Sequence, residues 1–459
     1  MYNIDKLLKE IKKIHFIGIG GSGMCPLAEI LYDWGYEISG SDNNPGDNIN
    51  KLRGFGIPIT MGQKAENIKG AEMIIYTAAL LSDNPELCAA RESGIPTFER
   101  SKLFGAITRM YSNCIGVCGT HGKTTTTAML TQILIMAGKD PTSVIGGRLP
   151  LIDSHASVGK TKLMVCEACE FANHFLELSP DVALILNVDE DHLEFFKNLD
   201  NIIQSFNKFA SSATKAIIFN GDDANTLRAV EGITDKQMIS FGRNPNNDYS
   251  ADNITYNRGS FPEFDVIYKK EKIAHVKLNI PGEHNISNAL SAFATAIYCG
   301  VSPEDCAKGA EAFAGAGRRF EVLGTYKGIT VADDYAHHPK ELEVTLRAVS
   351  KMGYNKVWAV FQPFTYSRTK ILFDDFVRVL QIPERCVMTE IMGSREVNTY
   401  GIYTKDLAEK IPSSVWYNTF EEVTEHIVQN AESGDLVITL GCGDIYKAAR
   451  MIVERLKEE

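Results

Sequence analysis

The segment Gly119-Thr-His-Gly-Lys-Thr-Thr125 constrains the fold of this chain more than any other feature. It follows the apolar run Cys114–Cys118 and precedes residues 124–137, in which apolar side chains recur at helical spacing. Glycines between a strand and a helix let backbone N–H groups close around phosphate oxygens. Lys123 can then reach the terminal phosphates, and the Thr124 hydroxyl can bind Mg²⁺. The alternative, a glycine turn beside a solvated lysine, leaves the flanking strand and helix unexplained. The motif is a compact variant, since Val117 stands where the usual pattern has its first glycine.

A second glycine-rich loop, Gly18-Ile-Gly-Gly-Ser-Gly23, also stands between an apolar run and a helical pattern, and Asp42 follows nineteen residues later. This spacing is typical of loops that place a pyrophosphate on a helix N-terminus. The motif alone does not identify the nucleotide. NAD is one candidate, and a nucleotide-diphosphate substrate is an equally good one in a chain that also carries an ATP loop.

The order of the apolar runs predicts an α/β protein. Strands are expected at 14–19, 36–39, 73–77, 114–118, 163–166 and 182–186, and again at 329–332, 357–361 and 436–440, with helices between them. Such alternation favours parallel sheets with right-handed crossovers. Residues 243–277 are richer in Asn, Asp and Tyr and predict inserted antiparallel strands. A chain of 459 residues is expected to form about three domains: a Rossmann-like domain at 1–110, a P-loop ATPase-like α/β domain at 111–317 and a Rossmann-like α/β domain at 318–459.

Composition excludes several classes of function. The net charge of −11 argues against nucleic acid or an anionic membrane as the main partner. No apolar run approaches the ~20 residues that span a bilayer, and the charged N-terminus does not resemble a secretory signal. The ten cysteines are mostly scattered in apolar segments, as reduced core cysteines are. We therefore expect a cytoplasmic protein. The pair Cys166 and Cys169 has C-x-x-C spacing, but no second pair or histidine is in register for zinc.

Two acidic segments follow predicted strands: Glu167-Ala-Cys-Glu170 and Asp189-Glu-Asp-His192. Open parallel sheets bind ligands beyond the carboxyl ends of their strands. Carboxylates suit Mg²⁺, and a neutral imidazole can complete a second cation site. A solvated acidic loop is an equally acceptable interpretation of each segment taken alone.

A fourth cluster is Asp333-Asp-Tyr-Ala-His-His-Pro339, preceded by Gly317-Arg-Arg-Phe320. Adjacent histidines after a strand, with arginines nearby in the sequence, indicate a site for an anion or an amino acid. We assign the isolated histidines His15 and His275 to packing or surface roles.

Taken together and in this order, the motifs resemble the Mur ligase family over nearly the whole chain. The further segments that carry the resemblance are Ser39-Gly-Ser-Asp42, Asn187 to His192, Gly282-Glu-His-Asn285 with Asn288, Phe361-Gln-Pro363 with Arg368, and Gly441-Cys-Gly-Asp444. The segments 119–124 and 333–339 are the most specific.

The resemblance implies a two-step ligation in peptidoglycan precursor synthesis. ATP would phosphorylate the lactyl carboxylate of UDP-N-acetylmuramate, and the amine of L-alanine would then displace phosphate from the acyl phosphate. The first domain would bind the UDP-sugar, the central domain ATP with two Mg²⁺, and the third the amino acid. Arg319 and Asp334 would reach from the third domain to the ATP site, so that domain closure completes it.

The resemblance also implies a role for each motif residue. Catalytic roles fall to Lys123, Glu170, His192 and His338, and metal binding to Thr124, Glu170 and His192. The residues implied to bind ATP are Gly119, Thr120, His121, Gly122, Lys123, Thr124, Thr125, His284, Asn285, Asn288, Arg319 and Asp334. Those implied to bind the UDP-sugar are Gly18, Gly20, Gly21, Ser22, Gly23, Met24, Ser41, Asp42 and Thr77. Those implied to bind the amino acid are Tyr335, His337, His338 and Arg368.

Two departures from the family pattern fall in the amino-acid region, where Phe364 replaces a histidine and Thr365 an arginine. The nearest alternative is therefore a recycling ligase that joins a preformed murein peptide, rather than alanine, to the same UDP-sugar. A folate-polyglutamate-type ligase would leave the first glycine loop unexplained. A dehydrogenase would leave Lys123 without a role, and a non-catalytic ATP switch would account only for the loop at 119–125. The sequence does not indicate the oligomeric state.

Overall fold

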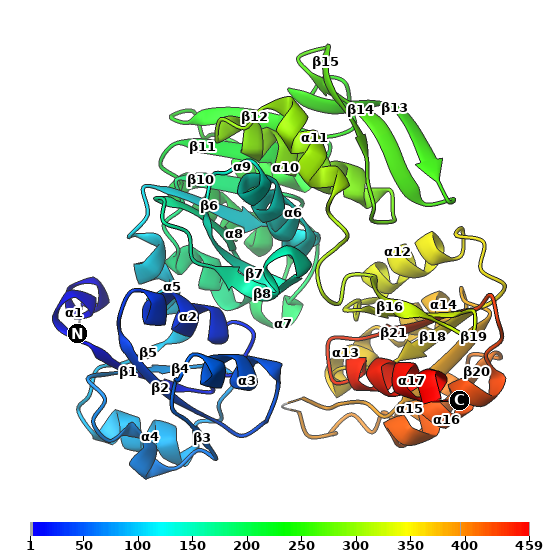
Figure 1. Ribbon diagram of the computed structural model, residues 1–459, viewed down its shortest axis with the longest axis horizontal. Helices are drawn as coiled ribbons and strands as arrows, with labels where there is room; N and C mark the ends of the chain where they lie inside the picture. The colour runs from blue at the N-terminus through cyan, green and yellow to red at the C-terminus, as the bar shows by residue number, and fades with distance from the viewer. Residues whose placement is uncertain (1–2, 395, 459) are drawn as a thin grey trace. The chain divides into compact units, whose positions relative to one another are not determined.

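The computed structural model describes residues 3–394 and 396–458 and contains three sheets (Figure 1). The predicted α/β class with three α/β sheets is confirmed. By packing, the chain divides into two compact units. The first comprises residues 1–251, 266–274 and 287–310, and the second comprises 252–265, 275–286 and 311–459. Among the described residues, no helix combines the length and the apolar character needed to cross a membrane.

The first sheet has five parallel strands in the order β3-β2-β1-β4-β5. Its elements are α1 Ile4–Glu10, β1 Lys13–Ile17, α2 Cys25–Asp33, β2 Glu37–Asp42, α3 Asp47–Gly54, β3 Ile59–Met61, η1 Ala65–Ile68, β4 Met73–Tyr76, α4 Pro85–Glu92, β5 Thr97–Glu99 and α5 Arg100–Thr108. The apolar run after Lys13 forms the central strand β1 because four of its five residues are buried. The glycine loop Gly18–Gly23 leaves this strand at its carboxyl end.

The second sheet has ten strands in the order β15-β14-β13-β12-β11-β10-β6-β9-β7-β8. Its elements are β6 Asn113–Cys118, α6 Lys123–Met136, β7 Thr142–Leu149, η2 Pro150–Ile152, β8 Ser154–Ser157, β9 Leu163–Glu167, η3 Phe171–Glu177, β10 Val182–Ile185, α7 Leu193–Phe196, α8 Leu199–Ser212, β11 Ala216–Asn220, α9 Ala224–Val230, β12 Gln237–Phe241, β13 Tyr249–Asn257, β14 Phe261–Tyr268, β15 Glu271–Lys277, α10 His284–Tyr298 and α11 Pro303–Glu311. Strand β6 lies between β10 and β9, so the loops after all three strands emerge side by side.

The third sheet has six strands in the order β16-β17-β21-β18-β19-β20, and only β16 is antiparallel to its neighbour. Its elements are β16 Glu321–Tyr326, β17 Ile329–Asp334, α12 Pro339–Val349, β18 Val357–Phe361, α13 Tyr366–Ile371, α14 Phe373–Val379, β19 Arg385–Thr389, α15 Thr404–Ala408, β20 Ser414–Tyr417, α16 Phe420–Asn430, β21 Leu436–Leu440 and α17 Tyr446–Glu458. Apolar clusters cover both faces of this sheet, as in a doubly wound fold.

The predicted elements agree with the observed ones to within a few residues. The run predicted at 182–186 forms β10, and the helical pattern at 124–137 forms α6. The inserted segment forms β13, β14 and β15, which are neighbours in chain order and joined by short turns. The edge strands β8 and β16 were not predicted from the sequence, and none of the six residues of β16 is buried.

Candidate nucleotide and metal site

The loop 119–122 connects the buried strand β6 to helix α6, and two of its glycines have positive φ. Gly119 has φ 145° and Gly122 has φ 84°. A Cβ at Gly119 would lie 2.9 Å from Leu186 Cβ, and one at Gly122 would lie 2.6 Å from Asn288 Oδ1. Glycine is therefore required at both positions by backbone conformation and by close packing.

Lys123, the first residue of α6, is directed back over the loop. Its Nζ donates to the carbonyl oxygens of Gly119 at 2.6 Å and Thr120 at 3.1 Å, and it lies 3.0 Å from each carboxylate oxygen of Glu170. Burial alone would lower the pKa of Lys123, but the charge of Glu170 raises it above its ordinary value. The ammonium group therefore stays charged at the centre of the phosphate loop.

Thr124 has a different acidic partner. Its hydroxyl donates to both carboxylate oxygens of Glu167, at 3.2 and 3.0 Å, and the amide of Gly146 donates to the same carboxylate at 2.8 Å. Glu167 ends strand β9, and Gly146 lies on β7. The two acids of the segment 167–170 thus divide their roles, with Glu167 holding Thr124 and Glu170 holding Lys123.

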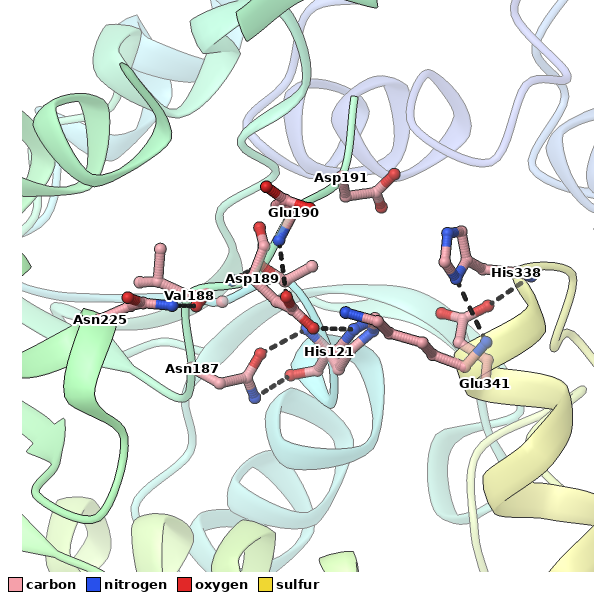
Figure 2. A network of polar contacts seen from close by, with 12 residues as sticks. His121, Asn187, Val188, Asp189, Glu190, Asp191, Asn225, His338 and Glu341 are labelled. Atoms are coloured by element: carbon pink, nitrogen blue, oxygen red, sulfur yellow. Dashed lines mark hydrogen bonds and ion pairs between the residues drawn. The ribbon is translucent and has the colours of Figure 1, made fainter. Parts of the chain in front are cut away.

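The loop after β10 braces the phosphate loop (Figure 2). The amide of His121 donates to Asn187 Oδ1 at 2.8 Å, and Asn187 Nδ2 donates to the carbonyl oxygen of His121 at 3.0 Å. The Thr120 hydroxyl exchanges hydrogen bonds with the backbone of Asp189. Asn187 therefore fixes the backbone of the glycine loop from the neighbouring strand end, a role that the sequence motif did not indicate.

Three side chains at this edge have the composition of a cation site. One ligand atom from each of Glu170, Asp191 and His192 lies within 4.8 Å of the others. Glu170 is 3% exposed, and its carboxylate forms an ion pair with Lys123. Two carboxylates and an imidazole are ligands that Mg²⁺ or Mn²⁺ accepts. Glu170 and His192 were predicted as ligands, and the structure adds Asp191 from the same segment.

Strained backbone holds this cluster in place. His192 has φ 51°, and Ala172 and Asn173 in η3 have φ 51° and 61°. These turns bring Phe171 edge-on to the His192 imidazole, with ring centroids 5.0 Å apart. Left-handed conformations at non-glycine residues are costly and often mark functional sites.

The residues predicted to frame adenine lie at the start of α10. Asn288 faces Gly122, and Asn285 Nδ2 donates to the carbonyl oxygen of Pro281 at 2.7 Å. A Cβ at Gly282 would lie 2.4 Å from His284 Cε1, so glycine allows the imidazole to fold over this turn. Asn285 and Asn288 are both buried.

The first glycine loop is held mainly by β2. The amides of Gly18 and Ile19 donate to the carbonyl oxygen of Ser41 at 2.8 and 3.0 Å, and the amide of Gly20 donates to Asp42 Oδ2 at 2.9 Å. Asp42, predicted to bind the UDP-sugar, thus braces the loop from within. Gly18 has φ 82°, and a Cβ there would lie 2.7 Å from Thr77 Cγ2.

Ser41 and Met24, both predicted to contact the sugar nucleotide, are fully buried beneath this loop. The Ser41 hydroxyl donates to Glu86 Oε2 at 2.7 Å, and His15 Nε2 lies 2.7 Å from Glu86 Oε1. His15 therefore has the packing role expected of it. Gly21 and Ser22, in contrast, are exposed at the tip of the loop.

In the third sheet, the neighbouring residues Arg318 and Arg319 have different partners. Arg318 donates to Asp333 Oδ2 at 2.8 Å and to the carbonyl oxygens of Gly441 and Gly443, which is a structural role. The Arg319 guanidinium lies 5.0 Å from the centroid of the Tyr335 ring.

Asp334 ends strand β17 and accepts from the amides of Phe320 and Ala336, both at 2.8 Å. Burial raises the pKa of Asp334 to about 6, although Arg319 acts to lower it. This carboxyl therefore fixes the two backbone turns that flank the segment 333–339.

The two predicted histidines have different partners. His338 caps α12, where its Nδ1 accepts from the Lys340 amide at 3.3 Å. His337 Nδ1 lies 3.3 Å from Glu341 Oε2, and its ring meets Phe364 edge-on with centroids 6.4 Å apart.

Arg368 lies on α13, where Thr365 caps the helix. The next loop supports this helix, because Glu396 accepts from the amide of Ser367 at 2.8 Å and from its hydroxyl. Burial raises the pKa of the Cys442 thiol to about 12, although nearby Arg368 acts to lower it. Arg368 and Cys442 thus belong to one end of the third sheet.

The two cysteines of the C-x-x-C pair are free thiols in and just after strand β9. All ten cysteines are free thiols, and Cys166 is fully buried. Burial also raises the pKa of Cys169 to about 11. Among the described residues, the single group with metal-ligand geometry contains no cysteine.

Comparison with protein families gives three matches in chain order. Residues 13–112 match the catalytic domain of the Mur ligase family, 117–296 the Mur ligase middle domain, and 318–443 the glutamate ligase domain of Mur ligases.

Similar proteins cover the full length. A UDP-N-acetylmuramate–L-alanine ligase of Caldanaerobacter subterraneus subsp. tengcongensis is 41% identical over 457 residues, covering 98% of this chain and 99% of the relative. The crystal structure of UDP-N-acetylmuramate-alanine ligase from Thermotoga maritima has a TM-score of 0.85 at 28% identity, covering 97% of this chain and 99% of that one. A murein peptide ligase from Psychrobacter arcticus has a TM-score of 0.77 at 25% identity, with the same coverage.

Proposed function

This chain belongs to the Mur ligase family, and we propose that it joins L-alanine to the lactyl carboxylate of UDP-N-acetylmuramate with consumption of ATP. The product would be a peptidoglycan precursor. The observation that carries the ATP chemistry is the charged Lys123 ammonium held in the phosphate loop by Glu170 at 3.0 Å. The identity of the amino acid is supported by the relative at 41% identity, which bears that activity in its name.

The reaction requires activation of a carboxylate. A carboxylate oxygen attacks the γ-phosphorus of ATP, the bond to the bridging oxygen breaks, and ADP leaves. The amine nitrogen of L-alanine then attacks the acyl carbon, loses a proton, and expels inorganic phosphate. Both attacking groups must be held in line, so binding and orientation supply most of the rate enhancement.

Within the phosphate loop, Lys123 is placed to neutralise the transferring phosphoryl group. Asn187 and the positive φ of Gly122 hold the loop amides in one conformation. Such preorganised donors cost no reorganisation when charge develops. Carboxylate and triphosphate repel each other, so this fixed positive charge is needed before the two can approach.

We propose that Mg²⁺ binds through Glu170, Asp191 and His192, with Thr124 as a further ligand near the phosphates. The donor set fits, since it offers hard oxygen atoms and one imidazole within 4.8 Å. When bound, Mg²⁺ would neutralise phosphate charge as a Lewis acid. In its absence, Lys123 balances the charge of Glu170.

We further propose that residues 1–110 bind the UDP-sugar, residues 111–317 bind ATP and residues 318–459 bind the amino acid. His337, Tyr335 and Arg368 are the candidates for the amino-acid end, with Arg368 for its carboxylate. We expect the protein to act in the cytoplasm, where ATP is supplied.

A peptide-recycling ligase is the second candidate, because the Psychrobacter murein peptide ligase shares the fold along the whole chain. Phosphate release with ATP and UDP-N-acetylmuramate, measured with L-alanine, glycine, L-serine or L-Ala-D-Glu-containing tripeptide, separates the two. We expect release to require both the UDP-sugar and L-alanine. Release with the tripeptide alone would assign the recycling activity, and release that no amine accelerates would refute ligation.

A further inference from the structure

Most backbone donors of the first glycine loop are already engaged. The amides of Gly18, Ile19 and Gly20 donate to Ser41 and Asp42, and the amide of Gly21 donates to the carbonyl oxygen of Gly18 at 3.2 Å. Within the described part of the chain, the amides of Ser22 and Gly23 donate to no acceptor. The loop therefore presents two adjacent donors at its exposed tip.

A guanidinium group lies against these donors. A Cβ built on Gly23 would lie 3.3 Å from Cζ, Nε and Nη1 of Arg100. Gly23 does not have a positive φ, so the close approach of Arg100, rather than backbone conformation, is what limits a side chain there. Arg100 is the first residue of α5, half-buried and 77 residues away in sequence from Gly23.

Across residues 3–394 and 396–458 the Arg100 guanidinium forms no hydrogen bond or ion pair. The neighbouring carboxylate of Glu99 is engaged elsewhere, since it accepts from the Ser101 amide at 3.2 Å and hydroxyl at 2.8 Å and lies 3.4 Å from His174 Nε2. A half-buried arginine without a partner is unusual, because its five donors lose water without gaining an acceptor.

We propose that Arg100 binds the diphosphate of the UDP-sugar together with the amides of Ser22 and Gly23. The planar fork of a guanidinium matches phosphate oxygens in a bidentate manner. Because Gly23 lies against the guanidinium, one phosphate can accept from both elements. The inference rests on the proposed function, because it names a further residue of the same UDP-sugar site.

This assignment also explains why the loop is glycine-rich at its end. A Cβ at Gly23 would press on the Arg100 guanidinium and require it to shift by a few tenths of an ångström, whereas Gly18 and Gly20 are constrained by Thr77 and Ile49 inside the domain. The first four loop amides hold the loop together, and the last two bind ligand. Sequence alone treats all of these glycines as equivalent.

The test compares Arg100→Gln and Arg100→Lys with Arg91→Gln in the intact enzyme. Arg91 is an exposed arginine of α4 that makes one long hydrogen bond, to Ser82 O at 3.4 Å, so its substitution removes the same charge from the same domain. Dissociation constants for UDP-N-acetylmuramate, UDP and uridine are measured by calorimetry or by competition. The steady-state KM values for ATP and L-alanine are measured in parallel.

We expect Arg100→Gln to weaken UDP-N-acetylmuramate and UDP binding about tenfold or more, in line with charge-assisted hydrogen bonds. Uridine binding and the KM values for ATP and L-alanine should change less than about twofold. The UDP affinity of Arg100→Lys should fall between those of wild type and Arg100→Gln. Unchanged UDP binding in Arg100→Gln would overturn the assignment of Arg100. An equal loss of uridine binding would also overturn it, because the effect would not depend on phosphate. If the wild-type enzyme binds neither UDP nor the UDP-sugar, the proposed function itself fails.

Discussion

The Nζ of Lys123 lies 3.0 Å from both carboxylate oxygens of Glu170, and the two side chains are almost fully buried. The same lysine donates to two carbonyl oxygens of its own loop. A nucleotide that enters this loop therefore meets a cation already desolvated and oriented. Because Glu170 is also a candidate cation ligand, Mg²⁺ and Lys123 would share one carboxylate.

The Lys123→Ala variant should lose turnover far more than UDP-sugar affinity. The ammonium stabilises charge on the transferring phosphoryl group, so kcat should fall by at least about 10²-fold. Calorimetry with UDP-N-acetylmuramate should give a dissociation constant within about twofold of wild type. If UDP-sugar binding collapses together with kcat, the assignment of the two nucleotides to separate domains is wrong.

Substitution of the candidate cation ligands should raise the Mg²⁺ requirement. We expect Asp191→Asn and His192→Gln each to increase the Mg²⁺ concentration for half-maximal activity, because each removes a ligand. Electron paramagnetic resonance of Mn²⁺ gives a second readout that does not depend on turnover. Glu190→Gln is the control, since this neighbouring exposed acid is outside the cluster. An equal shift of the Mg²⁺ requirement in Glu190→Gln would mean that the effect comes from the altered local charge and not from the loss of a ligand.

Alanine substitutions at Gly122 and Gly138 should separate packing from backbone strain. Both glycines have positive φ, 84° and 70°, but a Cβ meets Asn288 at 2.6 Å only at Gly122 and meets nothing within 4 Å at Gly138. We expect Gly138→Ala to cost about 1 kcal/mol of stability from left-handed strain. Gly122→Ala should cost more and also weaken ATP binding. Thermal melting at increasing ATP concentration measures the stability and the ATP affinity of each variant. Equal losses of both quantities in the two variants would contradict the packing argument.

His275 should confer stability that depends on pH. Its Nδ1 lies 2.7 Å from Asp265 and its Nε2 lies 2.9 Å from Glu263, while Lys277 lies 3.2 Å from Glu263. Hydrogen bonds to Asp265 and Glu263 raise the pKa of His275, and the pKa of Glu263 falls to about 2 through hydrogen bonds to Asn257 and His275.

Because the folded pKa of His275 is raised, its contribution to stability is full below the unfolded value of about 6.5 and is lost as pH rises through the folded value. The difference in Tm between wild type and His275→Gln should therefore be larger at pH 6 than at pH 9. A difference that does not vary with pH would assign His275 a purely steric role.

Local sequence patterns predicted the phosphate loop well because its requirements are local. A strand, a turn with positive φ and a helix that begins with lysine follow one another within about a dozen residues. The partner of Thr124 was not predictable in the same way. Glu167 is the last residue of β9 and Glu170 follows the strand, and only the folded course of the chain decides that Glu167 meets Thr124 and Glu170 meets Lys123. Likewise, nothing near Arg100 marks it as a ligand, since its significance comes from the packing of α5 against Gly23.

The sequence by itself determined the succession of α/β units, the two glycine loops and the family, because periodicity and glycine placement act over short stretches of chain. Tertiary structure alone decided which loop amides remain available. It determined that Asp42 braces the first loop, that the amides of Ser22 and Gly23 meet no acceptor among the described residues, and that the Arg100 guanidinium lies against Gly23. The physical reason is that a backbone amide is available to a ligand only when it finds no acceptor within the folded chain. That outcome depends on the packing of strands and helices distant in sequence, and no local pattern records it.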